Sequence, residues 1–230
     1  MSKHLKRYFA PKTWNIKRKG ITYITKPSPG THKIGVSMPL NVILRDILNY
    51  AESNREVKLI LENRNVEVDG IRRKDYRFPV GLLDVLSLND TNEHFRIVLD
   101  KRGKINLIKI GLEEKGLKMY KITGKKSIKG KIQLNLYDGK NILVKENDYK
   151  IGDTLLMTLG KNVVIKEKVS LDKNALIYLI GGTHIGHTGK VQDIIGNRIL
   201  YKDESGDTIE TLKEYAFAIG KDKPLISVSK

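Results

Sequence analysis

The hydrophobic residues between positions 40 and 61 recur at helical spacing. In the first stretch they fall at i, i+3, i+4, i+7, i+8 and i+11, as Leu40, Ile43, Leu44, Ile47, Leu48 and Ala51. One face of a helix has this period, so we expect a helix that packs against a core. Glu52-Ser53-Asn54 interrupts the pattern, and Ser53 or Asn54 is expected to cap a second helix carrying Val57, Ile60 and Leu61.

A β-hairpin is expected directly after the second helix. Hydrophobic and polar residues alternate in Val66–Arg72 around Asp69-Gly70. Asp-Gly favours the positive φ angles of a tight hairpin turn. Two short helices followed by a hairpin predict a small helix–loop–helix–hairpin module, to which we assign residues 38–88.

After Leu88 the pattern is almost entirely that of short strands. Three strand pairs are expected, each separated by a turn rich in glycine, aspartate or asparagine: Phe95–Leu99 with Ile105–Ile110, Leu134–Tyr137 with Ile142–Val144, and Thr154–Leu159 with Val163–Ile165. A last β unit begins with Ala175–Ile180, runs through a glycine-rich loop and returns in Arg198–Lys202. Such spacing is typical of small barrels or sandwiches, so we assign a central β domain to residues 89–170 and a second small β-barrel to residues 171–230.

The segment before the first helix has a different character. Four of the six prolines lie in the first 39 residues, together with Gly20, Gly30 and Gly35. Proline removes a backbone donor and fixes φ, so residues 1–37 are expected to form an extended arm with only short helical pieces. The overall prediction is a multi-domain α+β fold.

The charge distribution changes the interpretation of this arm. The first 45 residues contain ten lysines and arginines and no acidic residue, and so supply +10 of the formal net charge of +17. A polyphosphate backbone is the expected partner, because neutralising phosphates releases condensed counterions. A membrane is not expected, because the apolar residues of the arm form no helical stripe and the chain has no run of 18 apolar residues. With no cysteine, disulfides and thiolate metal sites are excluded.

Three groups of residues are therefore candidates for binding RNA. The first group lies in the arm: Lys3, Lys6, Arg7, Lys12, Lys17, Arg18, Lys19, Lys26 and Lys33. Trp14, the only tryptophan, is also a candidate. A single aromatic residue is usually buried in a core, but because an extended arm has little core of its own, stacking on a base or packing against an RNA sugar is expected at least as much. The second group belongs to the helical module: Arg45, Arg55, Lys58, Arg64, Arg72, Arg73 and Lys74. Singly such residues are usually solvated, but a cluster predicts a binding surface.

The third group lies in the β region. Gly124-Lys125-Lys126-Ser127 imitates the end of a P-loop, but Met119 stands where a glycine is required, so we interpret it as a basic β-turn. Gly182, Gly186, Gly189 and Val191 fit the Gly-x3-Gly-x2-Gly-x-Val pattern of a KOW motif. Glycines there allow positive φ and close approach of another backbone, so His184, His187 and Lys190 would face phosphates or bases. An ordinary β-loop with no partner fits the loop equally well. If the loop docks on RNA, Gly189→Val is expected to impair docking while leaving the fold intact.

No arrangement of residues predicts an enzyme or a cofactor. His184 and His187 have no adjacent carboxylate to complete a metal site. Serine, histidine and aspartate occur in no recognisable catalytic order. We therefore expect no catalytic residue, no metal, no cofactor and no small-molecule substrate.

The order of these parts resembles the small-ribosomal-subunit protein family "four-e" of archaea and eukaryotes. The resemblance covers essentially the whole chain and rests on His4-Leu5-Lys6-Arg7, Ala10-Pro11-Lys12, Trp14, Lys26-Pro27-Ser28-Pro29-Gly30, His32-Lys33, Pro39-Leu40, Leu44-Arg45, Glu56-Val57-Lys58, Val68-Asp69-Gly70, Arg72, Phe78–Val85, Phe217–Lys221, Lys223-Pro224 and Ile226-Ser227. It implies a structural protein of the cytoplasmic ribosome that binds small-subunit rRNA and contacts neighbouring small-subunit proteins. The end at Lys230, without the longer basic tail of eukaryotic members, favours an archaeal origin.

Two other functions remain as alternatives. The helical module is also similar to an RNA-binding domain of several pseudouridine synthases, although their Ser-Arg pair reads Ser53-Asn54 here, with Arg55 one position later. A pseudouridine synthase would need a catalytic domain for which the short-stranded region is too small. A KOW-bearing transcription elongation factor would have an acidic or neutral N-terminal domain, whereas this one is strongly basic.

Overall fold

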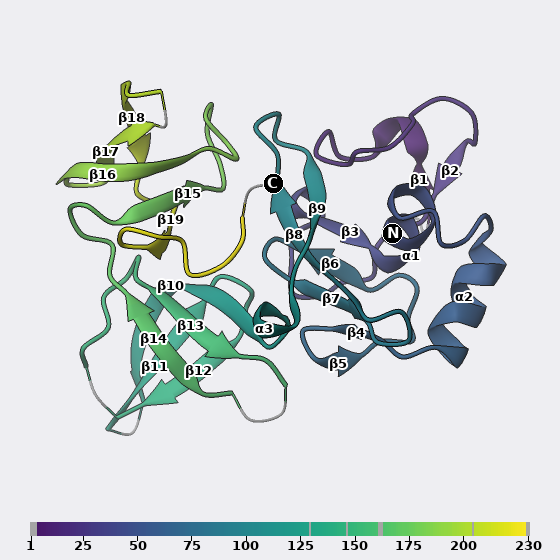
Figure 1. Cartoon of the computed structure of the whole chain (residues 1–230), viewed down its shortest axis with the longest axis horizontal. Coiled ribbons are helices and arrows are strands. Elements are labelled where there is room, and N and C mark those ends of the chain that lie inside the picture. Colours follow the sequence, from purple (N-terminus) through teal and green to yellow (C-terminus); the bar gives the residue numbers. More distant parts are fainter. Residues whose placement is uncertain (1–3, 129, 146, 161–162, 204, 229–230) are drawn as a thin grey trace. The chain divides into compact units, whose positions relative to one another are not determined.

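The computed structural model in Figure 1 describes residues 4–128, 130–145, 147–160, 163–203 and 205–228. Contacts between residues divide the chain into two units. The first unit comprises residues 1–98 and 104–116, and the second comprises residues 99–103 and 117–230. Most regular structure is antiparallel β-sheet with few helices. In the described residues, no helix has the length and hydropathy needed to cross a bilayer.

The first unit is built on a sheet with the strand order β5-β4-β7-β8-β9. The strands are β4 (Val66–Val68), β5 (Ile71–Arg72), β7 (Val85–Leu88), β8 (Glu93–Leu99) and β9 (Ile105–Lys109). The predicted hairpin is confirmed, with φ of 53° at Asp69 and 72° at Gly70 in the turn between β4 and β5. We expected a domain boundary between residues 88 and 89. In the structure, β7 pairs with β8 across this point, and the sheet continues through β9.

The helices of this unit differ in part from the prediction. Helical structure begins at α1 (Leu40–Val42) and continues as the π-helical turn η3 (Ile43–Ile47), but it does not reach Ala51. The chain leaves the helix in a wide turn in which the Tyr50 N–H donates to the Leu44 carbonyl at 2.9 Å. Asn49 takes φ of 56° at that turn, which ends the helix.

The second helix, α2 (Asn54–Asn63), begins as predicted. The Ser53 side chain accepts a hydrogen bond from the Glu56 N–H at 3.3 Å, and the Glu56 carboxylate accepts one from the Glu52 N–H at 2.8 Å. This is a capping-box arrangement. The bond from the Glu52 N–H, followed by one that the Ser53 hydroxyl donates at 2.9 Å, lowers the pKa of the Glu56 carboxyl group. Of the predicted inner face, Val57 and Leu61 are buried and Ile60 is half-buried.

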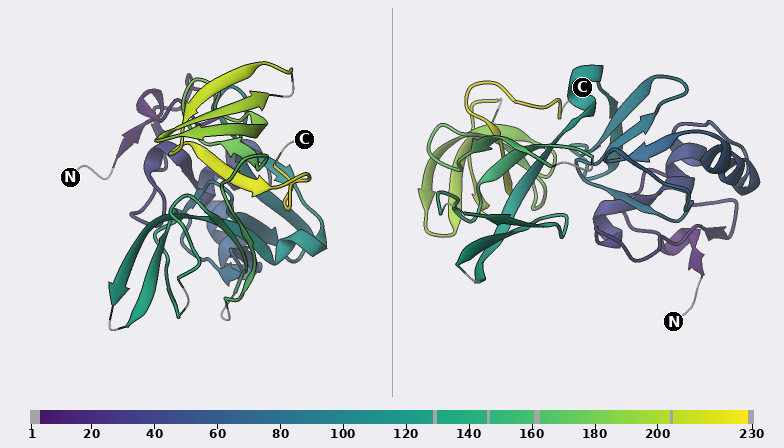
Figure 2. Two further views of the ribbon diagram at one scale, coloured as in Figure 1. Left: turned by 90° about the vertical axis from the view of Figure 1, so that its left-hand side faces the viewer. Right: turned by 90° about the horizontal axis from the view of Figure 1, so that it is seen from below.

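The N-terminal segment is folded onto the first unit instead of forming a separate extended arm. Its elements are β1 (Leu5–Lys6), η1 (Arg7–Phe9), β2 (Tyr23–Ile24), η2 (Ile34–Val36) and β3 (Ser37–Pro39). β1 pairs with β2, and β3 pairs with β6 (Pro79–Gly81). Both views of Figure 2 show the segment, in purple, against the blue part of the chain. At Gly81 a Cβ atom would lie 2.2 Å from the His32 ring, so this glycine permits the close crossing.

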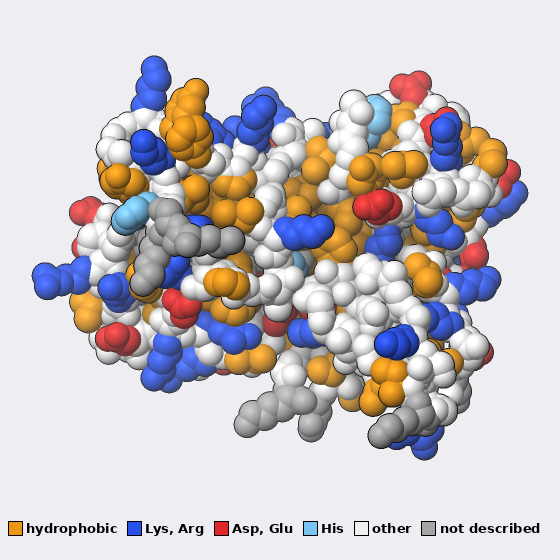
Figure 3. Space-filling model, turned by 180° about the vertical axis from the view of Figure 1, so that it is seen from behind, with side chains coloured by type: hydrophobic (Ala, Val, Ile, Leu, Met, Phe, Trp, Pro, Cys, Tyr) orange, Lys and Arg blue, Asp and Glu red, His pale blue; other side chains and the backbone are white. Residues whose placement is uncertain are grey.

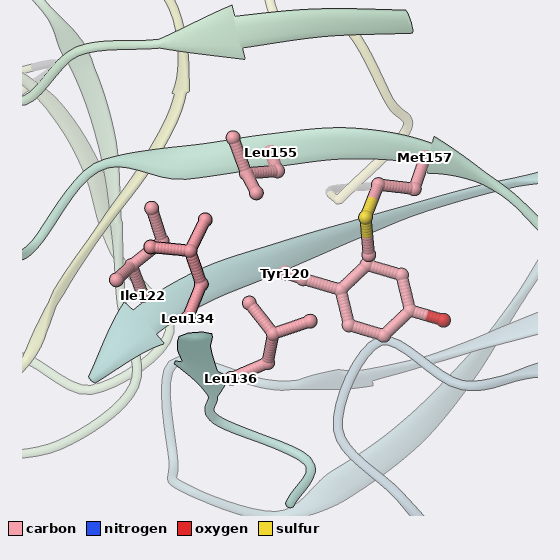
Figure 4. Packing of buried hydrophobic residues seen from close by; sticks show 6 residues of the cluster. All are labelled: Tyr120, Ile122, Leu134, Leu136, Leu155 and Met157. Carbon is pink, nitrogen blue, oxygen red and sulfur yellow. The ribbon is translucent and has the colours of Figure 1, made fainter. Parts of the chain in front are cut away.

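The second unit contains two five-stranded sheets. The first has the order β12-β11-β10-β13-β14, from β10 (Leu117–Ile128), β11 (Lys131–Leu136), β12 (Asn141–Val144), β13 (Thr154–Thr158) and β14 (Ile165–Val169). The predicted pair β11–β12 is confirmed. β13 also pairs with the strand that follows it, but β14 begins at Ile165, where the predicted strand ended. Figure 4 shows six buried side chains pointing toward one another from β10, β11 and β13: Tyr120, Ile122, Leu134, Leu136, Leu155 and Met157. Sequence reasoning missed β10, because its lysines mask the alternation of hydrophobic residues. Before β10, the first unit ends with the short helix α3 (Leu112–Lys115).

The second sheet of this unit has the order β18-β17-β16-β15-β19. Its strands are β15 (Leu176–Leu179), β16 (Thr188–Ile195), β17 (Arg198–Asp203), β18 (Thr208–Leu212) and β19 (Ala216–Gly220). The chain passes from one sheet to the other between Val169 and Leu176, the region in which a boundary was expected. Part of the predicted glycine loop is strand, because Gly189 and Lys190 pair with β15. Independent folding of the two sheets stays a prediction.

Candidate nucleic-acid interface

Two arginines fix the backbone of the N-terminal segment. Arg7 is buried, and its guanidinium donates to the Lys17 carbonyl at 2.8 Å and to the Asp46 carboxylate at 3.1 Å. Arg18 donates to the carbonyls of Tyr8, Ala10 and Pro11 at 3.2, 2.8 and 2.8 Å. Both guanidinium groups therefore stabilise the segment from within. Several donors of Arg7 and Arg18 thus already serve acceptors of the chain, and binding of RNA by these two arginines stays a prediction.

Trp14 is also a structural residue. Its side chain is 1% exposed, and its Nε1–H donates to the Ser37 carbonyl at 2.8 Å. Next to it, the Ile105 N–H donates to the Thr13 carbonyl at 2.7 Å. The expected stacking of Trp14 on a base is wrong for the folded chain, because both ring faces lie in the core.

Five lysines of the same segment have exposed side chains. We call them the arm lysines: Lys6, Lys12, Lys17, Lys19 and Lys33. Lys26 is half-buried, and Lys3 lies outside the described residues. Lys17 and Arg45 line the same open groove, which runs between residues 15–21 and 45–52. The structure thus presents a rigid backbone that carries exposed cations.

A second basic surface lies on α2 and the hairpin that follows it. Its exposed members are Arg55, Lys58, Arg64, Arg72 and Lys74. Lys58 lies 4.9 Å from the centre of the Tyr76 ring, and Arg72 donates to the Glu62 carbonyl at 2.9 Å. These two contacts hold α2 next to residues 72–76, so the basic residues of the helix and of the hairpin lie close together. Arg73 is half-buried over the Phe78 ring, and Arg45 donates to Asp46 and Asn54, so both have partners within the chain.

Figure 3 shows Lys and Arg side chains spread over one face of the molecule, with fewer Asp and Glu side chains between them. The distribution agrees with the excess of 43 lysines and arginines over 26 acidic residues. Such a surface attracts polyanions over distances of about 10 Å at moderate salt.

Lys125 and Lys126 do not lie in a turn. Both are within strand β10, where they pair with Leu134 and Gln133 of β11. The Lys125 amine donates to the Asn147 side chain at 2.5 Å and to the Tyr149 carbonyl. Lys126 is exposed. Of the two candidates, only Lys126 presents an exposed side chain to a partner.

The three candidate residues of the glycine-rich segment each lie near another ring or a carboxylate. The rings of His184 and His187 are 5.6 Å apart, and His187 Nδ1 lies 3.2 Å from an Asp203 carboxylate oxygen. The Lys190 amine donates to Asp222 at 3.3 Å. Sequence reasoning missed both aspartates, because they are 16 and 32 residues away along the chain. Within the described residues there is no group of three or more side chains suited to hold a metal ion.

The predicted close approach of another backbone occurs at Gly186. This residue has φ of 81°, and a Cβ atom there would lie 2.5 Å from the Asp100 carbonyl oxygen. The approaching backbone belongs to the turn at residues 100–103 of the same unit. The glycine is therefore needed for packing within the chain.

Gly189 has a similar role, and the expectation that Gly189→Val leaves the fold intact is wrong. A Cβ atom at this buried position would lie 2.5 Å from the Lys202 carbonyl oxygen and 2.5 Å from the Tyr201 ring. We expect Gly189→Val to destabilise the second unit by about 1–3 kcal/mol or more, since overpacking displaces backbone and ring together. Thermal unfolding followed by circular dichroism measures the loss. Gly116→Val is the control, because a Cβ atom there meets open space; equal midpoints for the two variants would contradict the expectation.

Comparison with known proteins places these features in a family. A family model described as "Ribosomal family S4e" matches residues 91–164, and one described as "RS4NT (NUC023) domain" matches residues 1–35. A small ribosomal subunit protein eS4 of Methanococcus aeolicus is 43% identical to this chain over 98% of the chain and 97% of the relative. The chain belongs to the eS4 family of small ribosomal subunit proteins.

Further comparisons agree with this membership. An eS4 protein of Methanosphaera stadtmanae is 43% identical over 98% of this chain and 95% of its own length. The crystal structure of the 30S ribosomal protein S4e from Thermoplasma acidophilum matches 81% of this chain and 96% of that one, with a TM-score of 0.69 and 30% identity. The predicted resemblance is thus confirmed, and the family is structural rather than enzymatic. These relatives support neither a pseudouridine synthase nor a transcription elongation factor.

Proposed function

We propose that this chain is a structural constituent of the small ribosomal subunit that binds and stabilises small-subunit rRNA in the cytoplasm and so supports translation. The observation that carries the proposal is the set of five exposed arm lysines in a stretch of 45 residues without an acidic residue. Neighbouring small-subunit proteins are the other expected partners. No cofactor or small-molecule substrate takes part.

The arm lysines act as counter-charge where segments of folded RNA approach one another. Each phosphate that a lysine neutralises releases condensed counterions, and this release drives binding. The backbone that carries the lysines is already held by Arg7, Arg18 and Trp14, so little chain entropy is lost on binding. Phosphate contacts position the protein without reading the base sequence.

The other candidate residues extend this surface. We propose that α2 and the β4–β5 hairpin act as a helix–loop–helix–hairpin RNA-binding module through the second basic surface. We further propose that residues 171–230 form a KOW domain. On binding, His184, His187 and Lys190 would give up their contacts with each other's rings, Asp203 and Asp222 and contact RNA instead. The hydrogen bond of Lys190 to the 90%-exposed carboxylate of Asp222 supports this, because an exposed ion pair contributes little and is readily replaced.

The salt dependence of binding tests the counter-charge mechanism. Changing all five arm lysines to glutamine is expected to make the plot of log K against log salt shallower by about 3–5 units, because each lost phosphate contact removes about 0.7–0.9 from the slope. Filter binding or fluorescence anisotropy with protein-free small-subunit rRNA, at several salt concentrations, measures the change.

A charge-matched variant provides the control. Lys131, Lys145, Lys166, Lys202 and Lys221 are exposed lysines of the second unit. Changing these five to glutamine removes the same net charge and is expected to change the slope less than the arm variant does. Equal slopes for the arm variant and the unmodified protein would rule out the arm as the main phosphate contact.

A further inference from the structure

Tyr8 and Phe9 are large aromatic residues that the fold leaves outside its core. Their residues are 76% and 69% exposed, and Tyr8 is the most exposed large hydrophobic residue of the described part of the chain. The ring centres lie 5.6 Å apart and the ring planes meet at 80°. Burying these two rings would stabilise the folded chain, yet both remain in contact with water. An exposed pair of this kind indicates a surface that binds a partner.

Flexibility of the backbone does not account for this exposure. Tyr8 and Phe9 are part of the short helix η1, and the preceding residue, Arg7, is buried and bonded to Lys17 and Asp46. The next residue, Ala10, is 4% exposed, and Arg18 holds the carbonyls on both sides of Phe9. The backbone beneath the two rings is therefore anchored at several points, while the rings project from it.

A fixed aromatic pair is well suited to recognition. An aromatic side chain has two rotatable torsions, so ordering it on binding costs little entropy compared with a lysine or methionine. The ring planes are nearly perpendicular, so the pair does not sandwich one flat ligand between its two rings. Each ring instead offers its own outer face, and the Tyr8 hydroxyl adds a hydrogen-bonding group.

The charge around the pair indicates the chemistry of the partner. Lys6 and Lys12 are exposed and flank the two aromatic residues in the sequence. The nearest acidic residue along the chain, Asp46, is bonded to Arg7 and Arg45. Aromatic rings among unopposed lysines form the combination that binds single-stranded nucleic acid, with stacked bases on the rings and phosphates on the cations.

We propose that Tyr8 and Phe9 are a stacking site for unpaired bases of the small-subunit rRNA, one base on each available ring face. This proposal rests on the proposed function. Phosphate contacts do not distinguish paired from unpaired RNA, whereas a stacking site selects unpaired nucleotides. The pair takes the role that the sequence suggested for Trp14. A 2′-hydroxyl or phosphate of the stacked nucleotide can form a hydrogen bond with the Tyr8 hydroxyl.

The test compares three variants for binding to protein-free small-subunit rRNA. Tyr8→Ala/Phe9→Ala removes both rings without a change of charge. It is expected to weaken binding by at least about 5-fold to 150-fold, the effect of losing one stacked base, with a larger loss if both rings carry a base, and to leave the salt slope unchanged. Tyr8→Phe/Phe9→Tyr keeps both rings and is expected to bind within about 3-fold of the unmodified protein. Leu112→Ala truncates another residue, 72% exposed, and is expected to have no effect.

A second measurement identifies the ligand directly. Chemical probing of rRNA nucleotides is expected to show a few unpaired positions that the unmodified protein protects and the double alanine variant does not. Equal affinity and equal protection for these two proteins would overturn the stacking site. So would unchanged rRNA binding combined with a defect that appears only when other ribosomal proteins are added, because the aromatic pair would then enter a protein pocket.

These results are separable from a failure of the proposed function. If the unmodified protein binds rRNA and the arm-lysine variant loses salt dependence while the double alanine variant binds normally, only the stacking site is wrong. If the unmodified protein does not bind the rRNA, the proposed function fails with it. Circular dichroism checks that the double variant folds, which is expected because both residues lie outside the core.

Discussion

Trp14→Ala will destabilise the first unit by about 3–5 kcal/mol, the range observed when a buried large aromatic side chain is truncated. The indole is 1% exposed, and its Nε1–H satisfies the Ser37 carbonyl. The substitution therefore leaves a cavity and an unpaired buried acceptor together. Urea unfolding followed by far-UV circular dichroism measures the loss, since the only tryptophan is removed as a fluorescent probe.

A second readout reports on the segment itself. Because Trp14 anchors the N-terminal segment, tryptic cleavage after Lys17 and Lys19 is expected to be faster in the variant than in the unmodified protein. Tyr8→Ala is the matched control, since it truncates an exposed aromatic side chain of the same segment and should change stability by about 0.5 kcal/mol or less. If both variants unfold at the same urea concentration, Trp14 is not an anchor.

Lys121→Met will destabilise the second unit by about 3 kcal/mol. The Lys121 amine donates to the carbonyls of Lys213, Glu214 and Ala216 at 3.0, 2.7 and 2.6 Å, which uses all three of its protons. Methionine keeps most of the volume but leaves three carbonyl groups without this donor, and an unsatisfied buried polar group costs about 1–3 kcal/mol. Burial lowers the pKa of Lys121 to about 8, so the amine is mostly protonated at pH 7.

The effect of this change should be concentrated around residues 213–216, whose carbonyls accept the hydrogen bonds of Lys121 on β10. We expect faster hydrogen exchange of the backbone amides of residues 213–219 in the variant, together with a lower midpoint of urea unfolding. Lys126→Met is the control, because Lys126 lies on the same strand and is exposed. Unfolding at the same midpoint in Lys121→Met and its control would show that the buried amine does not stabilise the unit.

The elements that were predicted correctly depend on signals a few residues apart. The Ser53 cap acts on a residue three positions later, and the Asp69-Gly70 turn requires only its own positive φ angles. The strands of the pairs β11–β12 and β13–β14 are close together in the sequence, so their pairing could be predicted from alternation and glycine position. The excess of lysine in the first 45 residues is likewise a property of the sequence alone.

The errors arise where contacts between distant residues decide the outcome. We expected β8 and β9 to belong to a separate β domain, but they extend the first sheet. Alternation of hydrophobic residues predicts a strand but does not show which sheet the strand joins. Lys125 was interpreted as a turn residue from the short motif Gly124-Lys125-Lys126-Ser127, yet it pairs with Leu134 within a long strand. His187 lies beside Asp203, 16 residues away, which no spacing rule indicates.

The sequence by itself determined that this chain has a basic, acid-free N-terminal stretch, capped and hairpin-forming segments and membership of the eS4 family. Only the tertiary structure decided which residues of that stretch are available to a partner. It buries Trp14 and Arg7 and exposes Tyr8, Phe9 and the arm lysines. The physical reason is that exposure depends on partners far along the chain, such as Ser37 for Trp14 and Asp46 for Arg7, and composition alone does not specify those contacts.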